Sequence, residues 1–517
     1  MKSTALVSLL LLAQCLALSS GTASAANKAP RRTRQGDYLN RLIRRSPLSE
    51  PSVAGAAMED TAVSTTKADR RGASIGSKEA DRVEKLPGQP AAAAGDGGRA
   101  RALLLLRRGR RQRQQLFGVE AAPPVAERRA RVLVARVRRH GGAWPVLRHE
   151  RRQDALPQPL LLEPRLQVIG AGHGAVANVL FLESPAGVGY SYSNTTADYS
   201  WSGDNKTAED AYLFLANWME RFPEYKGRDF YIIGESYAGH YVPQLAHQIL
   251  RHKPPSINLK GIMIGNALLD EWTDNKGMYD YYWTHALISD DTADAIPNNC
   301  NFTRPNDYSR SFTALANSSG NPCDEAIREA DEELRHINIY NIYAPICHSH
   351  NLIESLDPCT EHYVEAYLNN PDVQKALHAN VTRLDHPWIA CSDHLWPNWT
   401  DYDSTVLPII RDLMKNNIRV WVYSGDIDGN VPVTSTRYSL KQLQLSVAEK
   451  WRPWFSSTKG TGEVGGYVVQ DKGDLSFVTV REAGHEVPSY QPQRALVLVQ
   501  HFLAGKTLPD CKNCGQD

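Results

Sequence analysis

Hydrophobic positions between residues 177 and 270 follow two alternating periods. Short apolar runs at residues 179–182, 230–233 and 262–264 are bounded by turn residues and predict buried strands. Between the first two runs, apolar residues recur every three or four positions from Ala211 to Phe222, which predicts a helix. Strands that alternate with helices predict a parallel sheet covered by helices on both faces.

This alternation breaks at residues 275–360, which are rich in cysteines, aromatic residues and polar loops, and which we expect to form an inserted cap. Apolar runs at residues 420–423 and 477–480 restore the strand pattern. A helix is predicted over residues 494–504, ended by Gly505. The predicted fold class is α/β, with a doubly wound, mostly parallel sheet.

One strand-to-helix turn carries candidate chemistry. Ser236 lies between Gly234 and Gly239, directly after the strand run 230–233. A G-x-S-x-G pattern in this place is typical of a nucleophile elbow, in which a sharp turn exposes the serine hydroxyl at the edge of the sheet. Taken alone, the motif also fits an ordinary glycine-flanked turn.

A serine nucleophile needs a base and an orienting carboxylate, which in such folds follow in the order Ser, Asp, His. Asp426 and Asp428 follow the run 420–423, and His485 follows the run 477–480. The carboxyl ends of parallel strands meet at one edge of a sheet, where active sites gather. We expect Asp428 to orient His485, because the loop must leave the strand before it can reach the histidine, and Asp426 to fix the turn.

The N-terminal pattern and the glycosylation sequons predict that the chain enters the secretory pathway. Its 517 residues carry a net charge of only +1, which gives no sign of a nucleic-acid partner. Residues 1–25 join a basic start to an apolar run and an Ala-Ser-Ala end, the pattern of a signal peptide, and no later run is long enough to span a bilayer. Six Asn-x-Ser/Thr sequons fit a glycosylated secreted protein: Asn194, Asn205, Asn301, Asn317, Asn380 and Asn398.

Two segments near the N-terminus differ from the rest. Residues 26–80 are predicted to be a weakly structured leader, either a processed pro-segment or a disordered tail. Residues 91–176 are anomalous: 17 arginines and no lysine lie between residues 99 and 165. A basic binding segment and disorder are two interpretations of this stretch. We favour a third, an out-of-frame translation of GC-rich coding sequence, which over-produces Arg, Ala, Gly and Pro.

From residue 177 onward the chain closely resembles plant serine carboxypeptidases, most closely those of type II. The resemblance rests on the run 183–192 (ESPAGVGYSY), the elbow 234–239 (GESYAG), the segment 425–434 with GDID and VPVT, and the run 483–488 (AGHEVP). Residues 81–90 also look like the start of the family's mature domain, so that residues 81–517 would form one domain. The resemblance implies an α/β-hydrolase fold with no metal and no cofactor, acting on peptides and proteins. A homodimer is compatible with it.

The same resemblance implies roles for individual residues. Ser236 would be the nucleophile, His485 the base and acid, and Asp428 its orienting partner. Tyr237 would give one oxyanion-hole N–H, because the residue after the nucleophile provides it in this fold.

Two glutamates would contact the substrate. Glu235 would hold the C-terminal carboxylate of the substrate in a protonated form, which favours activity at acidic pH. Glu486 would favour Lys or Arg in the leaving residue. An ion-paired structural role for Glu235 and a solvent-exposed Glu486 are the alternatives.

The resemblance also shows what this chain lacks. The family supplies the second oxyanion donor from an Asn-Gly-Gly-Pro-Gly-Cys-Ser-Ser loop, where this chain has residues 140–144 (HGGAW). That loop's cysteine would pair with Cys391, and its absence accounts for the odd count of seven cysteines left after the signal peptide. The cap would hold its own bridges, Cys300 with Cys323 and Cys347 with Cys359.

Three functions therefore compete at this point. The first is a secreted or vacuolar serine carboxypeptidase that works through an acyl-enzyme. The second is an acyltransferase of the same fold, although such relatives usually carry aspartate in place of Glu235. The third is a family member impaired in catalysis by the missing loop.

Overall fold

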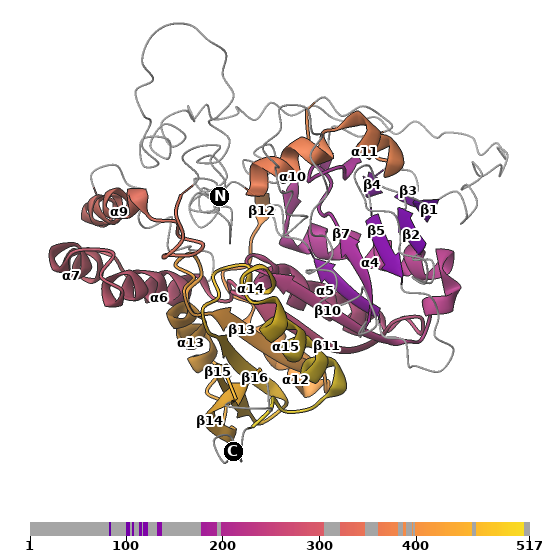
Figure 1. Cartoon of the computed structure of the whole chain (residues 1–517). Coiled ribbons are helices and arrows are strands. Elements are labelled where there is room, and N and C mark those ends of the chain that lie inside the picture. The colour runs from indigo at the N-terminus through magenta and orange to yellow at the C-terminus, as the bar shows by residue number, and fades with distance from the viewer. Residues whose placement is uncertain are drawn as a thin grey trace, which may run out of the picture.

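The structure is a computed structural model, shown in Figure 1. It describes residues 177–193, 198–303, 321–346, 360–380, 386–388, 395, 399–456 and 462–510, together with six short strands between residues 82 and 136. The predicted signal peptide (residues 1–25) and leader (residues 26–80) lie outside the described residues.

An 11-stranded sheet forms the centre of the molecule, in the order β1-β2-β5-β7-β6-β10-β11-β13-β16-β15-β14. The strands from β7 to β16 in this order pair in parallel, and antiparallel strands flank them on both sides. The strands of this sheet are β1 (Arg82–Val83), β2 (Ala100–Leu103), β5 (Phe117–Ala121), β6 (Val132–Arg136), β7 (Asn178–Leu182), β10 (Asp229–Glu235), β11 (Asn258–Gly265), β13 (Arg419–Gly425), β14 (Val447–Phe455), β15 (Val464–Asp471) and β16 (Leu475–Val480).

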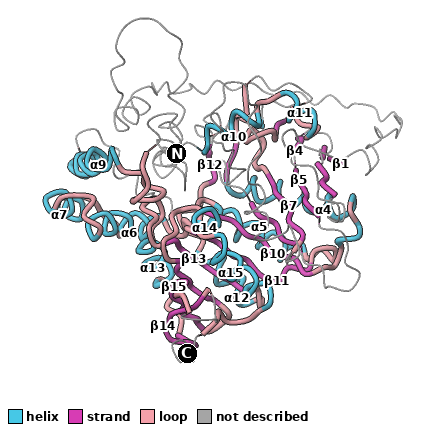
Figure 2. Tube along the Cα trace, viewed as in Figure 1, coloured by secondary structure: helices cyan, strands magenta, loops and turns pink. Residues whose placement is uncertain are grey.

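Smaller elements surround this sheet (Figure 2). Two minor sheets pair β12 (Trp399–Asp401) with β9 (Ser202–Gly203), and β3 (Leu106–Arg107) with β4 (Arg113–Gln115) and β8 (Tyr192–Ser193). The helices are α4 (Asp204–Arg221), η3 (Pro223–Tyr225), α5 (Ala238–His252), α6 (Glu271–Thr284), α7 (Asp290–Asn299), α9 (Pro322–Glu333), η4 (Leu334–His336), α10 (Thr360–Leu368), α11 (Pro371–Ala376), α12 (Leu407–Lys415), α13 (Val433–Lys441), α14 (Val487–Tyr490) and α15 (Pro492–Ala504).

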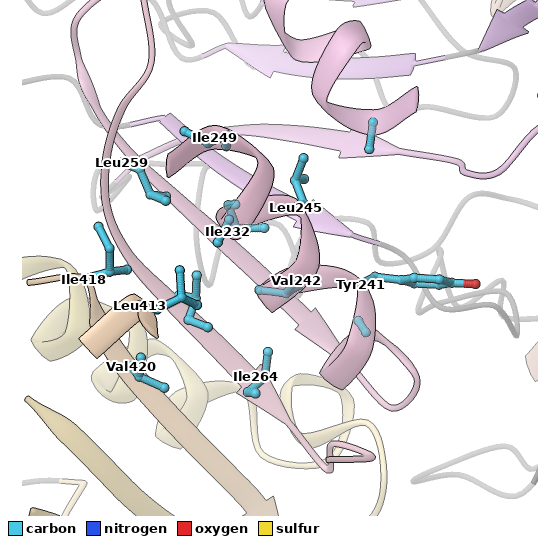
Figure 3. Close-up of a cluster of buried hydrophobic side chains, with 14 of the residues drawn as sticks. Ile232, Tyr241, Val242, Leu245, Ile249, Leu259, Ile264, Leu413, Ile418 and Val420 are labelled. Carbon is cyan, nitrogen blue, oxygen red and sulfur yellow. The ribbon is translucent and has the colours of Figure 1, made fainter. Parts of the chain in front are cut away.

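Side chains of the central strands alternate between two hydrophobic clusters. In β10, Phe230 and Ile232 belong to a cluster with apolar residues of α4, α5 and α12, whereas Tyr231 and Ile233 belong to a cluster with residues of α15. Figure 3 shows part of the first cluster, with α5 lying across the strands. Helices therefore cover both faces of the parallel strands, as the apolar runs predict.

The described part of the predicted cap region, residues 275–360, consists of helices joined by turns and loops. Residues 271–336 contribute α6, α7, α9 and η4, which pack around their own cluster of buried aromatic and aliphatic side chains. The Cys300–Cys323 disulfide, with a Cα–Cα distance of 4.8 Å, joins the end of α7 to the start of α9. The sheet then resumes with β13, so the insertion separates two parts of one α/β fold.

Strands from the anomalous segment, residues 91–176, take part in the central sheet. The backbone of β6 pairs in parallel with β7 on one side and with β10 on the other. β2 and β5 extend the sheet beyond β7. In the part of the chain that the structure describes, no helix is both long and apolar enough to cross a bilayer.

Candidate active site

Ser236 lies in the tight turn between β10 and α5. Its φ of 65° falls in the left-handed region, which a serine rarely adopts and which aims its side chain away from the strand. Two glycines make the turn possible. A Cβ at Gly239 would lie 2.1 Å from the carbonyl oxygen of Leu268, and one at Gly234 would lie 2.5 Å from Cβ of Ala238. The motif therefore forms the elbow that its sequence predicts.

His485 and Asp428 form a buried pair at the carboxyl ends of β16 and β13. Nδ1 of His485 lies 2.6 Å from Oδ2 of Asp428, and both side chains are fully buried. Asp428 also accepts hydrogen bonds from the backbone N–H groups of Asn430 (2.8 Å) and Val431 (3.2 Å). With Nδ1 engaged in this way, Nε2 of His485 is the nitrogen left to exchange a proton with a substrate or nucleophile.

The two neighbouring aspartates have different surroundings. Asp426 does not contact the imidazole; its Oδ1 accepts a hydrogen bond of 2.7 Å from the backbone N–H of Glu482. Burial raises the pKa of Asp426, and the hydrogen bonds from backbone N–H groups oppose that shift. Asp426 thus ties the loop after β13 to the loop before His485, while Asp428 holds the imidazole.

Asn266 connects the elbow to the Asp428–His485 pair. The backbone N–H of Ser236 donates to the carbonyl of Gly265 over 2.9 Å. The next residue, Asn266, is fully buried and donates from Nδ2 to Oδ2 of Asp428 over 2.7 Å. Its Oδ1 accepts from the backbone N–H of Gly425 over 3.1 Å. Asn266 has no motif of its own, and its place two residues after the predicted strand run 262–264 was the usable signal for it.

Ser236 Oγ and His485 Nε2 have no hydrogen-bond partner among the described residues. Both atoms are buried. Catalytic hydrogen bonds are often long in enzymes without substrate and shorten in the complex. Both groups are thus available for chemistry rather than engaged in structural contacts.

The other predicted site residues lie on the same elements. Glu235 is the last residue of β10, is half-buried, and pairs with Gly265 of β11. Tyr237 is buried and directly precedes α5. Glu486 precedes α14, is half-buried, and accepts a hydrogen bond of 3.0 Å from Ser489 Oγ.

A small hollow of about 30 Å³ lies beside the elbow and the loop that carries Asp428. Leu268 lines it, and the backbone N–H of this residue donates to the carbonyl of Ser236. The side chains of Glu271 and Asp274 give the hollow an acidic wall, and burial raises the pKa of Asp274 to about 8. The remaining lining residues are His240, Asn275, Met278, Tyr402, Asn430, Val431 and Ser435.

The structure describes three of the six predicted glycosylation sites. Asn205 and Asn301 are exposed, and Asn380 is half-buried with its Nδ2 donating to Gln374 Oε1. Asn194, Asn317, Asn398 and the predicted Cys347–Cys359 bridge lie outside the described residues. Within the described ranges, no three His, Cys, Asp or Glu side chains are grouped as metal ligands.

Comparisons with known proteins give a family match. The family model described as serine carboxypeptidase matches residues 174–505, more than half of the chain. Serine carboxypeptidase-like 40 of Arabidopsis thaliana is 52% identical over 343 residues, which cover 65% of this chain and 66% of the relative. Serine carboxypeptidase 24 of the same plant is 47% identical over 358 residues, covering 64% of this chain and 73% of the relative. The chain thus spans about two thirds of the length of the first of these relatives.

Among solved structures, Kex1Δp, a prohormone-processing carboxypeptidase from Saccharomyces cerevisiae, has the same fold. The TM-score is 0.65 at 18% identity, covering 85% of this chain and 98% of the yeast protein. A similarity at this identity concerns the fold alone. The family match and the plant relatives go further, and from them we conclude that this chain belongs to the serine carboxypeptidase family.

Proposed function

We propose that the chain is a serine-type carboxypeptidase that removes C-terminal residues from peptides and proteins through an acyl-enzyme. The observation that carries this proposal is the buried contact of 2.6 Å between His485 and Asp428, on the same sheet edge as the elbow serine. Family membership supports a hydrolase of this kind.

The proposed reaction proceeds in two steps. Ser236 Oγ attacks the scissile carbonyl carbon while Nε2 of His485 takes its proton, and Asp428 stabilises the resulting imidazolium. The C–N bond then breaks, His485 returns the proton to the leaving amine, and the acyl group remains on Ser236. Water attacks this ester with His485 again as the base, which frees the shortened peptide.

We assign the substrate contacts as follows. The backbone N–H of Tyr237 donates to the developing oxyanion. Glu235, in its protonated form, binds the C-terminal carboxylate of the substrate, so activity is greatest at mildly acidic pH. Glu486 favours a basic leaving residue. The second oxyanion donor has no counterpart in the sequence, and we expect its loss to lower the rate.

A fluorophosphonate probe together with an N-blocked dipeptide tests this function. Wild type should bind the probe covalently and release the C-terminal amino acid, whereas Ser236→Ala should do neither. Ser456→Ala, on a half-buried serine at the end of β14, is the matched control and should retain both activities. Absence of labelling in folded wild type would contradict the proposal and would favour an impaired family member.

The same assay separates hydrolysis from acyl transfer. If the acyl-enzyme passes its acyl group to an added alcohol or amine in preference to water, the chain is an acyltransferase. We further propose a secreted or vacuolar location, based on the predicted signal peptide and the sequons. Immunolocalisation of the tagged full chain tests this, and size-exclusion chromatography tests whether it forms a homodimer.

A further inference from the structure

A fully buried carboxylate lies behind the elbow. Asp204, the first residue of α4, has no solvent exposure. Its Oδ1 accepts hydrogen bonds from Tyr237 Oη (2.9 Å) and Trp399 Nε1 (3.2 Å). Its Oδ2 accepts from Gln244 Nε2 (3.3 Å) and from the backbone N–H of Asp403 (3.4 Å). Each oxygen of this carboxylate therefore accepts two hydrogen bonds.

The negative charge of Asp204 raises the pKa of two neighbouring carboxyls. The pKa of Asp401 is raised to about 6, first by burial and then by the negative charge of Asp204. Burial and the same charge also raise the pKa of Asp403. The charge of Asp204 thus acts on both neighbouring carboxyls.

Three side chains beside the elbow point toward Asp204. Tyr237, His240 and Gln244 are spaced three and four residues apart, so they share one face of the turn and of α5. Nδ1 of His240 lies 3.3 Å from Oδ2 of Asp204. The imidazole ring of His240 stacks on Tyr237 at 4.9 Å and on Tyr402 at 5.5 Å. The ring of Tyr237 is thus held at its hydroxyl by Asp204 and on its face by His240.

Tyr237 is also the residue whose backbone N–H donates to the oxyanion in the proposed function. We propose that Asp204 is a positioning residue that fixes this N–H by holding the phenol of Tyr237. The inference rests on the proposed function, since it requires a tetrahedral intermediate on Ser236. Asp204 itself does not touch the substrate.

The position of an oxyanion donor must be precise, which is why a restraint on Tyr237 matters. An oxyanion donor must lie about 2.7–3.1 Å from the developing charge, and a misplacement of about 1 Å can cost on the order of a hundred-fold in rate. In this chain, Tyr237 is the oxyanion donor that the sequence supplies. A tether on its side chain restrains rotation of the peptide group between Ser236 and Tyr237.

Four variants of the full chain test this inference: Asp204→Asn, Tyr237→Phe, the double variant of these two and, as matched control, Asp331→Asn. Asp331 lies half-buried in α9 of the cap, and burial raises its pKa to about 7, so the control also alters a partly desolvated carboxyl. Active sites are counted by fluorophosphonate titration, so that loss of folded protein does not affect the result. The readouts are kcat and KM per active site for an N-blocked dipeptide, and the affinity for a peptide aldehyde that forms a tetrahedral adduct with serine.

We expect Tyr237→Phe and Asp204→Asn each to lower kcat by about ten-fold with KM unchanged, and to weaken aldehyde binding by the same factor. The double variant should lose no more than Asp204→Asn alone, because both changes cut one connection. Asp331→Asn should leave all three values unchanged.

Unchanged kcat and aldehyde affinity per active site in Tyr237→Phe would overturn the inference, even if the melting temperature falls. Tyr237→Phe removes one hydroxyl only, so it decides the matter should Asp204→Asn fail to fold. A wild-type chain that neither labels nor hydrolyses would instead count against the proposed function.

Discussion

The two sides of the central sheet are built from different kinds of sequence. From β10 to β16, the strands carry alternating apolar residues that fill two clusters, and their carboxyl ends carry the elbow, Asp428 and His485. Four other strands of the sheet, β1, β2, β5 and β6, come from before the family match at residues 174–505, and the last three of them lie in the arginine-rich stretch. Yet β6 pairs in the centre of the sheet, directly beside β10.

This contrast shows that a nucleophile elbow and a complete active site have separate requirements. The elbow needs one strand, one helix and two glycines, all local in sequence. The oxyanion hole needs a second donor from a distant loop, which the arginine-rich stretch does not supply in the form the family resemblance implies. Under the proposed function, the chain therefore combines the elbow serine and a buried Asp428–His485 pair with an oxyanion side that lacks the loop of the family.

The largest expected effect on activity comes from a substitution at Asp428. Asp428→Asn should lower kcat by about 10⁴-fold, because the amide cannot stabilise the imidazolium and favours the wrong tautomer of His485. Active-site-titrated kinetics on an N-blocked dipeptide measure this effect. Asp426→Asn is the matched control, since Asp426 bonds to the loop backbone and not to the imidazole. Equal losses in the two variants would show that Asp428 has no special role.

The next largest effect on activity should come from replacing the arginine-rich segment. Replacing residues 91–176 with a segment that carries the Asn-Gly-Gly-Pro-Gly-Cys-Ser-Ser loop should raise kcat/KM by about 10²- to 10³-fold, the usual worth of one oxyanion donor. The same replacement with that loop shortened is the control. No gain over the original chain would mean that residues 91–176 already supply an equivalent donor. The coding sequence around these residues, translated in the other two frames, tests their proposed origin.

A third experiment tests whether the N-terminal strands stabilise the sheet. Val134 of β6 pairs with Ile232 on one side and with Leu180 on the other, so Val134→Pro should remove ladder hydrogen bonds at the centre of the sheet. We expect the free energy of unfolding to fall by about 3 kcal/mol or more, measured by urea denaturation. Val447→Pro, at the first position of the edge strand β14, should cost much less. If both substitutions lower the free energy of unfolding by a similar, small amount, β6 does not stabilise the sheet.

The smallest effect concerns Glu183, at the junction between the two sides. Burial raises the pKa of Glu183 from 4.5 to about 7, although hydrogen bonds from Trp388 Nε1 and the Tyr190 N–H oppose this. The folded state thus binds the proton more tightly than the unfolded state. Its contribution is fully present below pH 4.5 and is lost as the pH rises through about 7.

We therefore expect wild type to lose up to about 3 kcal/mol of stability relative to Glu183→Gln between pH 4.5 and 7.5. Thermal unfolding of both proteins across this range measures the difference. Parallel stability curves would show that Glu183 does not titrate between the two states.

Much of the C-terminal half was predictable because its signals are local. Apolar runs and helical spacing predict β10, α5, β11, β13 and β16, and the cap bridge Cys300–Cys323 follows from the family resemblance. The elbow at Ser236 needs only glycines within three residues of the serine. The order Ser, Asp, His at successive strand ends gave the candidate triad, because parallel strands place their carboxyl ends together.

Contacts between distant segments were decided only by the tertiary structure. The sequence favours Asp428 over Asp426 only because Asp428 lies farther along the loop, and the path of the loop in the structure brings Asp428 to His485. Asn266 and Asp204 have no motif of their own, since each acts through partners in other elements. The place of β6 beside β10 was not visible either, because pairing between strands depends on backbone hydrogen bonds that every residue except proline can form. The sequence by itself determined the elbow and the order of the catalytic side chains, and three-dimensional packing decided which side chains support them.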